Sequence, residues 1–244
     1  MITLYQFSSS PFTEKVSRIL SFKGLDYQVE EINRLKAKNY REVSPFGKFP
    51  AIDISDEPVC DSTDIAHTLE DIYPAKKLIP ADKLLKAQVH IIEDWADESL
   101  YFYEMTMRVS WLHNAKNTLA KIKNTLPPLP DWLLLKIIVK KASKIVAAQG
   151  LGRKCLPQIV NDVRRHLEAI NSMLSDSQWL VGDNITLADI AVVAQLNCLL
   201  DAVEVQEMLD LFPAIVPWIA RVDKVAPYKK LEDVRDHKQQ MSPC

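Results

Sequence analysis

Apolar and polar residues in the first eighty positions alternate between strand-like runs and helical spacing. The pattern predicts strands at Ile2 to Phe7, Tyr27 to Glu31, Ala51 to Ile54 and Pro58 to Cys60, and helices at Pro11 to Lys23 and Ser62 to Tyr73. The Asn33 to Val43 segment between them is less regular. A βαβ unit followed by a hairpin and a helix therefore predicts an α/β first domain.

After Pro74 and Pro80 the apolar spacing becomes purely helical. Long periodic segments run over Lys83 to Asn114 and Ile159 to Leu174, and the Leu-Pro-Pro-Leu-Pro sequence that ends at Pro130 interrupts them. These patterns predict an α/β domain over residues 1–78, an all-α domain over residues 85–230 and a tail over residues 231–244.

The sequence of the all-α part predicts a helix start at Gly182-Asp183-Asn184-Ile185-Thr186. Thr186 is placed to cap a helix, and Asp189 three residues on can return a hydrogen bond to the cap amide. Ile185 before the cap can pack against Ile190, which completes a capping box with its hydrophobic staple. We expect a structural role for this box and assign no chemistry to Asp189.

Candidate chemistry lies at the first strand-to-helix turn, Ser8-Ser9-Ser10-Pro11-Phe12. Ser10 is placed to cap the helix and Pro11 to open it, and such a cap is worth about 1 kcal/mol. Backbone amides and the positive end of the helix dipole then converge beside small hydroxyl groups, which forms a site for an anion such as a thiolate. On this segment alone, an ordinary helix cap explains the same residues.

Two later segments change that interpretation. Ser44-Pro45-Phe46-Gly47-Lys48-Phe49-Pro50 leads into a short strand, and Asp61-Ser62 precedes the amphipathic run that contains Ile65, Leu69 and Ile72. Ser62 reads as a helix cap whose amides could hold a carboxylate while Asp61 meets an ammonium group. Together with the serine turn and the Thr186 capping box, these segments resemble the glutathione transferase superfamily over about residues 1 to 225.

The resemblance implies a thioredoxin-like domain followed by a helical domain, and it implies site residues. Ser10-Pro11-Phe12 falls on the turn that carries the family's catalytic Tyr, Ser or Cys, so Ser10 is the first candidate, with Ser9 and Ser8 open. The Lys48-Phe49-Pro50 step matches the cis-proline loop that pairs with the cysteinyl part of glutathione. Asp61-Ser62 matches the pair that holds the γ-glutamyl end.

The activity implied is conjugation of the glutathione thiolate to a small hydrophobic electrophile. Tyr103, Met107 and Trp111 are the candidates for the electrophile pocket, although aromatic residues at such spacing commonly belong to a core. Two other classes stay open. One is a non-catalytic, metaxin-like binding module, and the other is a glutathione-dependent thiol oxidoreductase, which Ser10 in place of a cysteine disfavours.

Composition limits the remaining alternatives. A formal net charge of -2 over 244 residues argues against bulk binding of nucleic acid. The four cysteines form no Cys-x-x-Cys pair, so we expect no metal site. The first residues show no secretory leader, and no apolar run approaches the roughly 20 residues needed to cross a bilayer. We therefore expect a cytoplasmic protein, and the resemblance implies a homodimer.

One stretch departs from the common family pattern. Lys136, Lys140 and Lys144 lie on one stripe of a helix predicted over residues 131–148. A core helix with a solvated lysine face explains this pattern, and we expect no membrane contact. A basic amphipathic helix on an anionic membrane surface is the alternative.

Overall fold

A computed structural model describes residues 1–34 and 36–229, and the chain divides into two compact units. The first contains Met1–Leu78 together with the described residues from Asp223 onward, and the second is Ile79–Val222. Residues 223–229, which the helical pattern assigned to the second domain, thus belong with the first unit. The tail predicted over residues 231–244 lies outside the described residues.

The first unit is built on a four-stranded mixed sheet with the strand order β2-β1-β3-β4. Its strands are β1 (Ile2–Gln6), β2 (Tyr27–Glu31), β3 (Ala51–Ile54) and β4 (Glu57–Cys60). β1 pairs in parallel with β2 and antiparallel with β3, and β3 and β4 form an antiparallel hairpin. All four strands lie within one residue of the positions that the alternation predicts.

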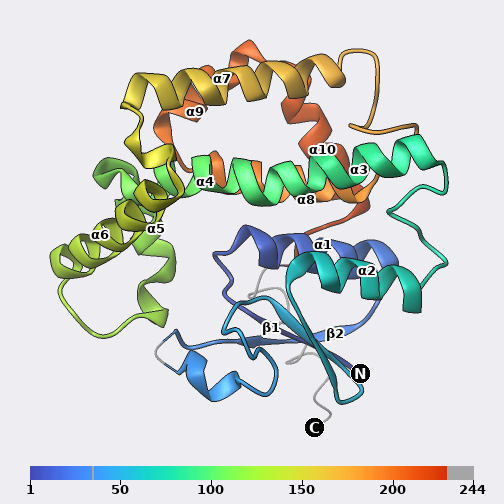
Figure 1. Ribbon diagram of the computed structural model, residues 1–244, viewed down its shortest axis with the longest axis horizontal. Helices are drawn as coiled ribbons and strands as arrows, with labels where there is room; N and C mark the ends of the chain where they lie inside the picture. The colour runs from blue at the N-terminus through green and yellow to red at the C-terminus, as the bar shows by residue number, and fades with distance from the viewer. Residues whose placement is uncertain (35, 230–244) are drawn as a thin grey trace, which may run out of the picture. The chain divides into compact units, whose positions relative to one another are not determined.

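Two helices, α1 (Pro11–Lys23) and α2 (Ser62–Ile72), lie side by side on one face of this sheet, as Figure 1 shows. α1 begins at Pro11, where a missing amide hydrogen costs nothing. It ends at Gly24, whose φ of 72° is left-handed and whose amide closes onto the Leu20 and Ser21 carbonyls. The start and the end of α1 are therefore as predicted.

The second unit is helical. In chain order it contains α3 (Lys83–Trp95), η2 (Ala96–Leu100), α4 (Tyr101–Glu104), η3 (Met105–Ser110), α5 (Leu112–Ile122), α6 (Asp131–Gln149), α7 (Leu156–Met173), α8 (Leu187–Leu199) and α9 (Val203–Met208). The last helix, α10 (Ile215–Val225), begins in this unit and its final residues belong to the first unit. α8 is the core of this unit, because all its residues except Asn197 and Cys198 are buried, and α3 and α4 pack on it (Figure 1). An α/β part followed by an all-α part is the predicted fold class, and it is confirmed.

The long periodic segment from Lys83 to Asn114 is helical, but it is not one regular α-helix. η2 and η3 are π-helical, and the backbone becomes extended at Trp111 before α5 starts. The Thr106 hydroxyl donates to the Phe102 carbonyl at 2.6 Å, and the Ser110 hydroxyl donates to the Thr106 carbonyl at 2.7 Å. Such bonds from side chains to preceding carbonyls compete with the helical ladder, which the apolar spacing alone does not reveal.

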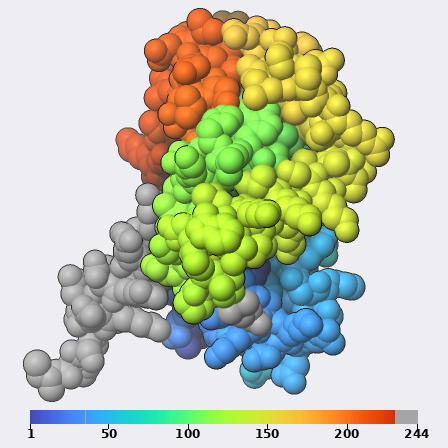
Figure 2. All heavy atoms as spheres, turned by 90° about the vertical axis from the view of Figure 1, so that its left-hand side faces the viewer, coloured from blue at the N-terminus to red at the C-terminus, as the bar shows by residue number. Residues whose placement is uncertain are grey.

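α6 packs on η3 and α5 and turns its lysines outward. Leu134, Ala142 and Val146 are buried, whereas Lys136, Lys140 and Lys144 are exposed. The surface over α5 and α6 faces the viewer in Figure 2. Within residues 1–34 and 36–229, no helix combines the length and the apolar character that crossing a bilayer requires.

Candidate functional site

The three segments singled out in the sequence meet at one end of the sheet of the first unit. Tyr5 near the end of β1 pairs with Ala51 at the start of β3, and Ala51 pairs with Cys60 at the end of β4. The serine turn follows β1, the Phe49-Pro50 step precedes β3, and Asp61 follows β4. The strand register therefore brings the three segments to the same end of the sheet.

Side-chain contacts tie these segments together. The Phe7 and Phe49 rings pack edge to face with centroids 5.2 Å apart, which links the serine turn to the proline step. The buried Lys15 ammonium on α1 donates to the Thr63 hydroxyl at 3.3 Å, which links α1 to the start of α2. The Phe49-Pro50 peptide is cis, as the family resemblance implied.

Ser10 stands at the N-cap position of α1, but its side chain does not cap the helix. Its backbone is extended, and no cap bond from its side chain exists in the part of the chain that the structure describes. The prediction that the hydroxyl folds back onto the helix amides is therefore wrong. The Ser10 hydroxyl thus does not accept from the first amides of α1, and a bound anion could accept from them in its place.

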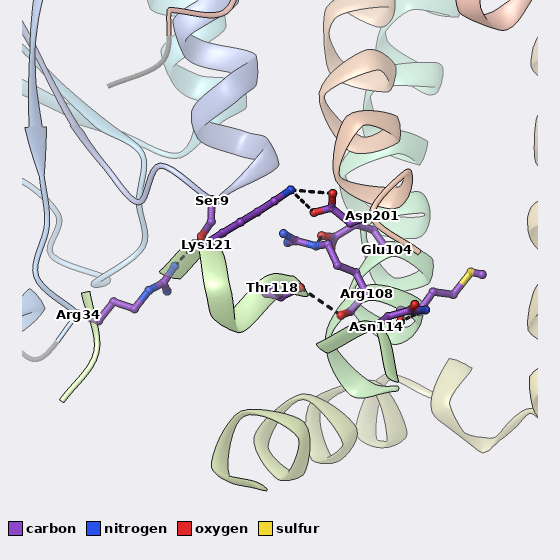
Figure 3. Close-up of polar contacts among 9 residues, drawn as sticks. Ser9, Arg34, Glu104, Arg108, Asn114, Thr118, Lys121 and Asp201 are labelled. Carbon is purple, nitrogen blue, oxygen red and sulfur yellow. Dashed lines mark hydrogen bonds and ion pairs between the residues drawn. The ribbon is translucent and has the colours of Figure 1, made fainter. Parts of the chain in front are cut away.

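Ser9 has a cationic partner that the sequence did not suggest. Arg34 Nη2 donates to Ser9 Oγ at 3.1 Å, as Figure 3 shows. The same guanidinium lies over the Phe7 ring, 4.1 Å from its centroid. A positive charge thus stands beside the serine turn, next to the position where an anion would bind.

Ser8 is exposed, and its backbone is held by two distant residues. Its amide donates to Glu31 Oε1 at 3.0 Å, and its carbonyl accepts from the Tyr228 hydroxyl at 3.0 Å. Glu31 Oε2 also accepts from the Gln6 side-chain amide at 3.3 Å. The serine turn is therefore fixed by residues from β2 and from the end of the described chain.

At the start of α2 the cap is Asp61 and not Ser62. The Asp61 carboxylate accepts from the Thr63 amide at 3.0 Å, and Ser62 is the buried first residue of the helix. Asp61 has a φ of 83°, a left-handed backbone that brings its short side chain onto the following amide. The predicted pair is present, with the capping role moved by one residue.

Lys48 and Phe49, two further predicted residues, differ in exposure. The Lys48 side chain is exposed, and its carbonyl accepts from the Ser44 hydroxyl at 2.5 Å. Phe49 is only 8% exposed, and its ring is edge to face with Tyr40 as well as Phe7. Any contribution of Phe49 to ligand binding would therefore come from its backbone.

The predicted electrophile residues lie in the second unit, and two of them are core residues. Met107 is fully buried, and Tyr103 is 9% exposed with its hydroxyl donating to Asp162 at 3.1 Å. Burial and this bond to a carboxylate raise the pKa of Tyr103. Trp111 is half-buried and stacks on His113 with ring centroids 6.0 Å apart.

Charged groups near these residues are paired with one another. A buried ion pair joins Glu104 to Arg108, and Thr118 donates to the Arg108 carbonyl at 3.2 Å (Figure 3). Burial raises the pKa of Glu104, against the effect of Arg108. On the surface Lys121 donates to both Asp201 oxygens at 2.7 Å. These contacts explain the charges as parts of the helical packing.

In the described parts of the chain, neither a metal centre nor the surface groove of the second unit involves the predicted site residues. Among the described residues no group of His, Cys, Asp and Glu side chains is arranged to hold a metal ion. A surface groove of about 490 Å³ lies between α7 and α9. It is lined by Leu156, Pro157, Val160, Asn161, Arg164, Glu204, Glu207, Met208 and Leu211, and it contains no residue predicted for the site.

Three residues of the site were missed by sequence reasoning, namely Glu31, Arg34 and Tyr228. Glu31 ends a predicted strand, Arg34 lies in an irregular segment, and Tyr228 was placed in the helical domain. None of them is part of a motif with fixed spacing. Only their contacts in the folded chain reveal them.

The site and the fold agree with known families. Residues 4–77 match the N-terminal domain of glutathione S-transferases, and residues 148–224 match the C-terminal domain of the same enzymes. The chain belongs to the glutathione S-transferase superfamily. The first unit is accordingly thioredoxin-like, and the Thr186 capping box lies in the matched C-terminal domain, as predicted.

Several named relatives are similar over most of their length. A probable maleylacetoacetate isomerase 1 of Drosophila melanogaster is 25% identical over 203 residues, which is 80% of this chain and 67% of the relative. Protein LigF of a Sphingobium strain is 25% identical over 210 residues, covering 80% of this chain and 78% of LigF. These relatives are enzymes of the superfamily, which uses glutathione as its co-substrate.

Two solved structures share the fold. The β-etherase LigF superposes with a TM-score of 0.68 at 21% identity, covering 97% of this chain and 99% of LigF. Ure2p5 from Phanerochaete chrysosporium, cocrystallized with 1-(S-glutathionyl)-2,4-dinitrobenzene, has a TM-score of 0.65 at 18% identity. That match covers 99% of this chain and 98% of Ure2p5.

Proposed function

We propose that this protein is a glutathione transferase that joins the glutathione thiolate to small hydrophobic electrophiles. The observation that carries the proposal is the meeting of the serine turn, the Phe49-Pro50 step and Asp61 at one end of the sheet. Each segment offers a different chemistry to one tripeptide. The turn suits a thiolate, the proline step suits a peptide backbone, and Asp61 suits an ammonium group.

Glutathione would lie across this end of the sheet in an extended form. The backbone of Phe49 would pair with the cysteinyl residue, and the exposed Lys48 would offer a cation to a carboxylate. Asp61 would bind the γ-glutamyl ammonium with the carboxylate oxygen that the Thr63 amide does not occupy. The amides at the start of α2, including that of Ser62, would bind the γ-glutamyl carboxylate.

Catalysis requires a lowered thiol pKa. A thiol near the reference pKa of about 8.5 is only roughly 3% ionised at pH 7, so a decrease of about two units makes it mostly thiolate. A charge-assisted hydrogen bond contributes about 1.5–3 kcal/mol and a helix amino terminus about 0.3–1 kcal/mol, whereas one pKa unit requires about 1.36 kcal/mol. The serine turn and α1 together are sufficient.

Ser10 is the first candidate for the hydroxyl that donates to the sulfur. Its place at the amino end of α1 adds the helix dipole to its own hydrogen bond, and its side chain makes no cap bond within the described chain. Ser9 is the second candidate, because Arg34 donates to its oxygen and so polarises its hydrogen toward an anion. Ser8 ranks third.

The electrophile pocket would come from the helical domain, residues 85–230. Trp111 is the most accessible of the three candidates, since Met107 is buried and the Tyr103 hydroxyl is engaged by Asp162. The names of the relatives, an isomerase and an etherase, extend the reactions to be tested to isomerisation and ether cleavage. A homodimer in the cytoplasm remains part of the proposal.

The direct test measures glutathione binding by calorimetry and then turnover with chlorodinitrobenzene, with an ether and with a cis-alkene substrate. We expect saturable binding and at least one turnover that depends on glutathione. Binding without any turnover would favour the non-catalytic module instead. Reduction of mixed disulfides would favour the oxidoreductase, for which the turn lacks a cysteine.

A further inference from the structure

The end of the described chain returns to the first unit and contacts the serine turn. The Tyr228 hydroxyl donates to the Ser8 carbonyl at 3.0 Å, although the two residues are 220 positions apart in the sequence. We propose that Tyr228 is a positioning residue that sets where the Ser9 and Ser10 hydroxyls stand. The inference rests on the proposed function, because it concerns the same hydroxyls.

Ser8 is held on both sides of its backbone. Glu31 accepts from its amide and Tyr228 donates to its carbonyl, so the residue before the two candidate hydroxyls has fixed partners in both directions. Ser8 itself is exposed, so water would replace a partner that was removed, and the freed amide or carbonyl would lose its fixed position. The conformation of the turn therefore depends on long-range contacts as well as on its own sequence.

A buried arginine explains why Tyr228 reaches this position. Arg18 on α1 is 2% exposed, and its guanidinium donates to the Ala226 carbonyl and to Asp223, each at 2.7 Å. Its Nε donates to Glu14 at 2.8 Å. A buried cation requires such partners, and two of the three lie on the returning chain. Arg18 thereby anchors residues 223–226 to α1.

The Arg18 anchor lies on α1, and the serine turn leads directly into the same helix. α1 carries Ser10 at its amino end and Arg18 two turns later, and Pro227 restricts the backbone between the anchored Ala226 and Tyr228. The returning chain thus contacts α1 through Ala226 and contacts the turn before α1 through Tyr228. A hydrogen bond from a serine to a sulfur depends steeply on distance and angle, so a small shift of the turn would weaken it.

The experiment compares Tyr228→Phe with Tyr27→Phe in the full chain. Both changes remove one hydroxyl from the first unit and keep the ring, but the Tyr27 hydroxyl contacts Ser17 at 2.7 Å, outside the turn. For Tyr228→Phe we expect kcat to fall roughly three- to tenfold, as for the loss of one neutral hydrogen bond. The KM for glutathione should stay within about twofold, because uniform binding is not removed. The pH midpoint of thiolate formation should rise.

A second measurement does not depend on glutathione. Amide hydrogen exchange at Ser9 and Ser10 should be faster in Tyr228→Phe than in the wild type, and Tyr27→Phe should leave it unchanged. Asp223→Asn, which weakens the Arg18 anchor without touching the turn, should shift exchange and kcat in the same direction by less.

The outcomes separate the two proposals. Kinetics, titration and exchange in Tyr228→Phe that equal those of Tyr27→Phe would overturn the positioning role. A wild-type protein that binds no glutathione would overturn the proposed function instead. In that case the exchange rates would still decide whether Tyr228 holds the turn.

Discussion

The starts of α8 and α1 differ in how their cap positions are hydrogen-bonded. At α8, Asp189 accepts from the Thr186 amide, the Thr186 hydroxyl, the Leu180 amide and the Trp218 indole. At α1, Ser10 occupies the cap position and its side chain makes no cap bond among the described residues. The start of α8 is therefore capped by the protein's own side chains, whereas the start of α1 could accept a ligand.

The difference separates a structural motif from a functional one. Asp189 is fully buried, and burial raises its pKa although its four donors act against this rise. Such a group stabilises the fold and has no capacity left for a substrate. The serine turn is partly exposed and stands beside Arg34, and the Ser10 side chain makes no cap bond within residues 1–34 and 36–229. Satisfaction of hydrogen bonds, more than residue type, distinguishes the two.

The largest expected effect is the loss of stability in Asp189→Ala. The change leaves the Leu180 amide, the Thr186 amide and the Trp218 indole as buried donors without acceptors, each costing about 1–3 kcal/mol. We expect the free energy of unfolding in urea to fall by about 3–5 kcal/mol. Asp183→Ala, an exposed change in the same loop, is the control, and an equal loss there would contradict the account.

The next effect concerns Asp61, which both caps α2 and is proposed to bind an ammonium group. Asp61→Asn keeps a side-chain oxygen for the Thr63 amide but removes the charge, whereas Asp61→Ala removes both. Calorimetry should show glutathione affinity reduced roughly tenfold or more in both variants, as for a lost charged hydrogen bond. Only Asp61→Ala should also lower stability. Unchanged affinity in both would remove Asp61 from the site.

Thr186→Ala and Ser10→Ala compare the two helix starts directly. Thr186→Ala should cost about 1 kcal/mol of stability, the usual value of a lost cap. Ser10→Ala should cost less than about 0.5 kcal/mol, because its side chain does not cap α1. Thermal unfolding of both variants measures this. Equal losses would show that Ser10 caps its helix in solution after all.

His166 provides the smallest effect and a further contrast with Asp189. Its Nε2 is buried and has no hydrogen-bond partner among the described residues. Burial lowers the pKa of His166 below its usual 6.5, with Arg165 and Lys154 acting in the same direction and Asp162 against it. The stability that depends on neutral His166 is therefore complete above pH 6.5 and is lost as the pH falls through the lowered value.

His166→Gln should therefore flatten the dependence of unfolding free energy on pH below 6.5. Urea titrations between pH 7.5 and pH 5 would measure the slope. A slope in His166→Gln as steep as in the wild type would contradict the burial argument.

Much of the fold follows from local sequence. Alternation placed the four strands, and Pro11 with Gly24 fixed both ends of α1, because these residues act through their own backbone preferences. The π-helical segments could not be predicted from the sequence, since Thr106 and Ser110 disturb the helical hydrogen bonds without changing the apolar period. A helical period predicts a helix but not its hydrogen-bond pattern.

The site was predicted only in the parts that carry a motif. The serine turn, Pro50 and Asp61 stand beside strand ends, so local signals reveal them. The partners that hold the turn do not, because Glu31 and Tyr228 reach Ser8 from 23 and 220 residues away. Ser62 was predicted as the cap where Asp61 is the cap, since both side chains can cap a helix and the backbone angle decides.

The central claim is that the serine turn ionises bound glutathione, and the ultraviolet absorbance of the thiolate against pH tests it most directly. Wild-type protein should show a midpoint about two units below that of the free thiol. Ser10→Ala should raise this midpoint, and Ser8→Ala should leave it unchanged. A raised midpoint in Ser9→Ala alone would move the role to Ser9 and its partner Arg34. No change in any of the three variants would contradict serine catalysis in this protein.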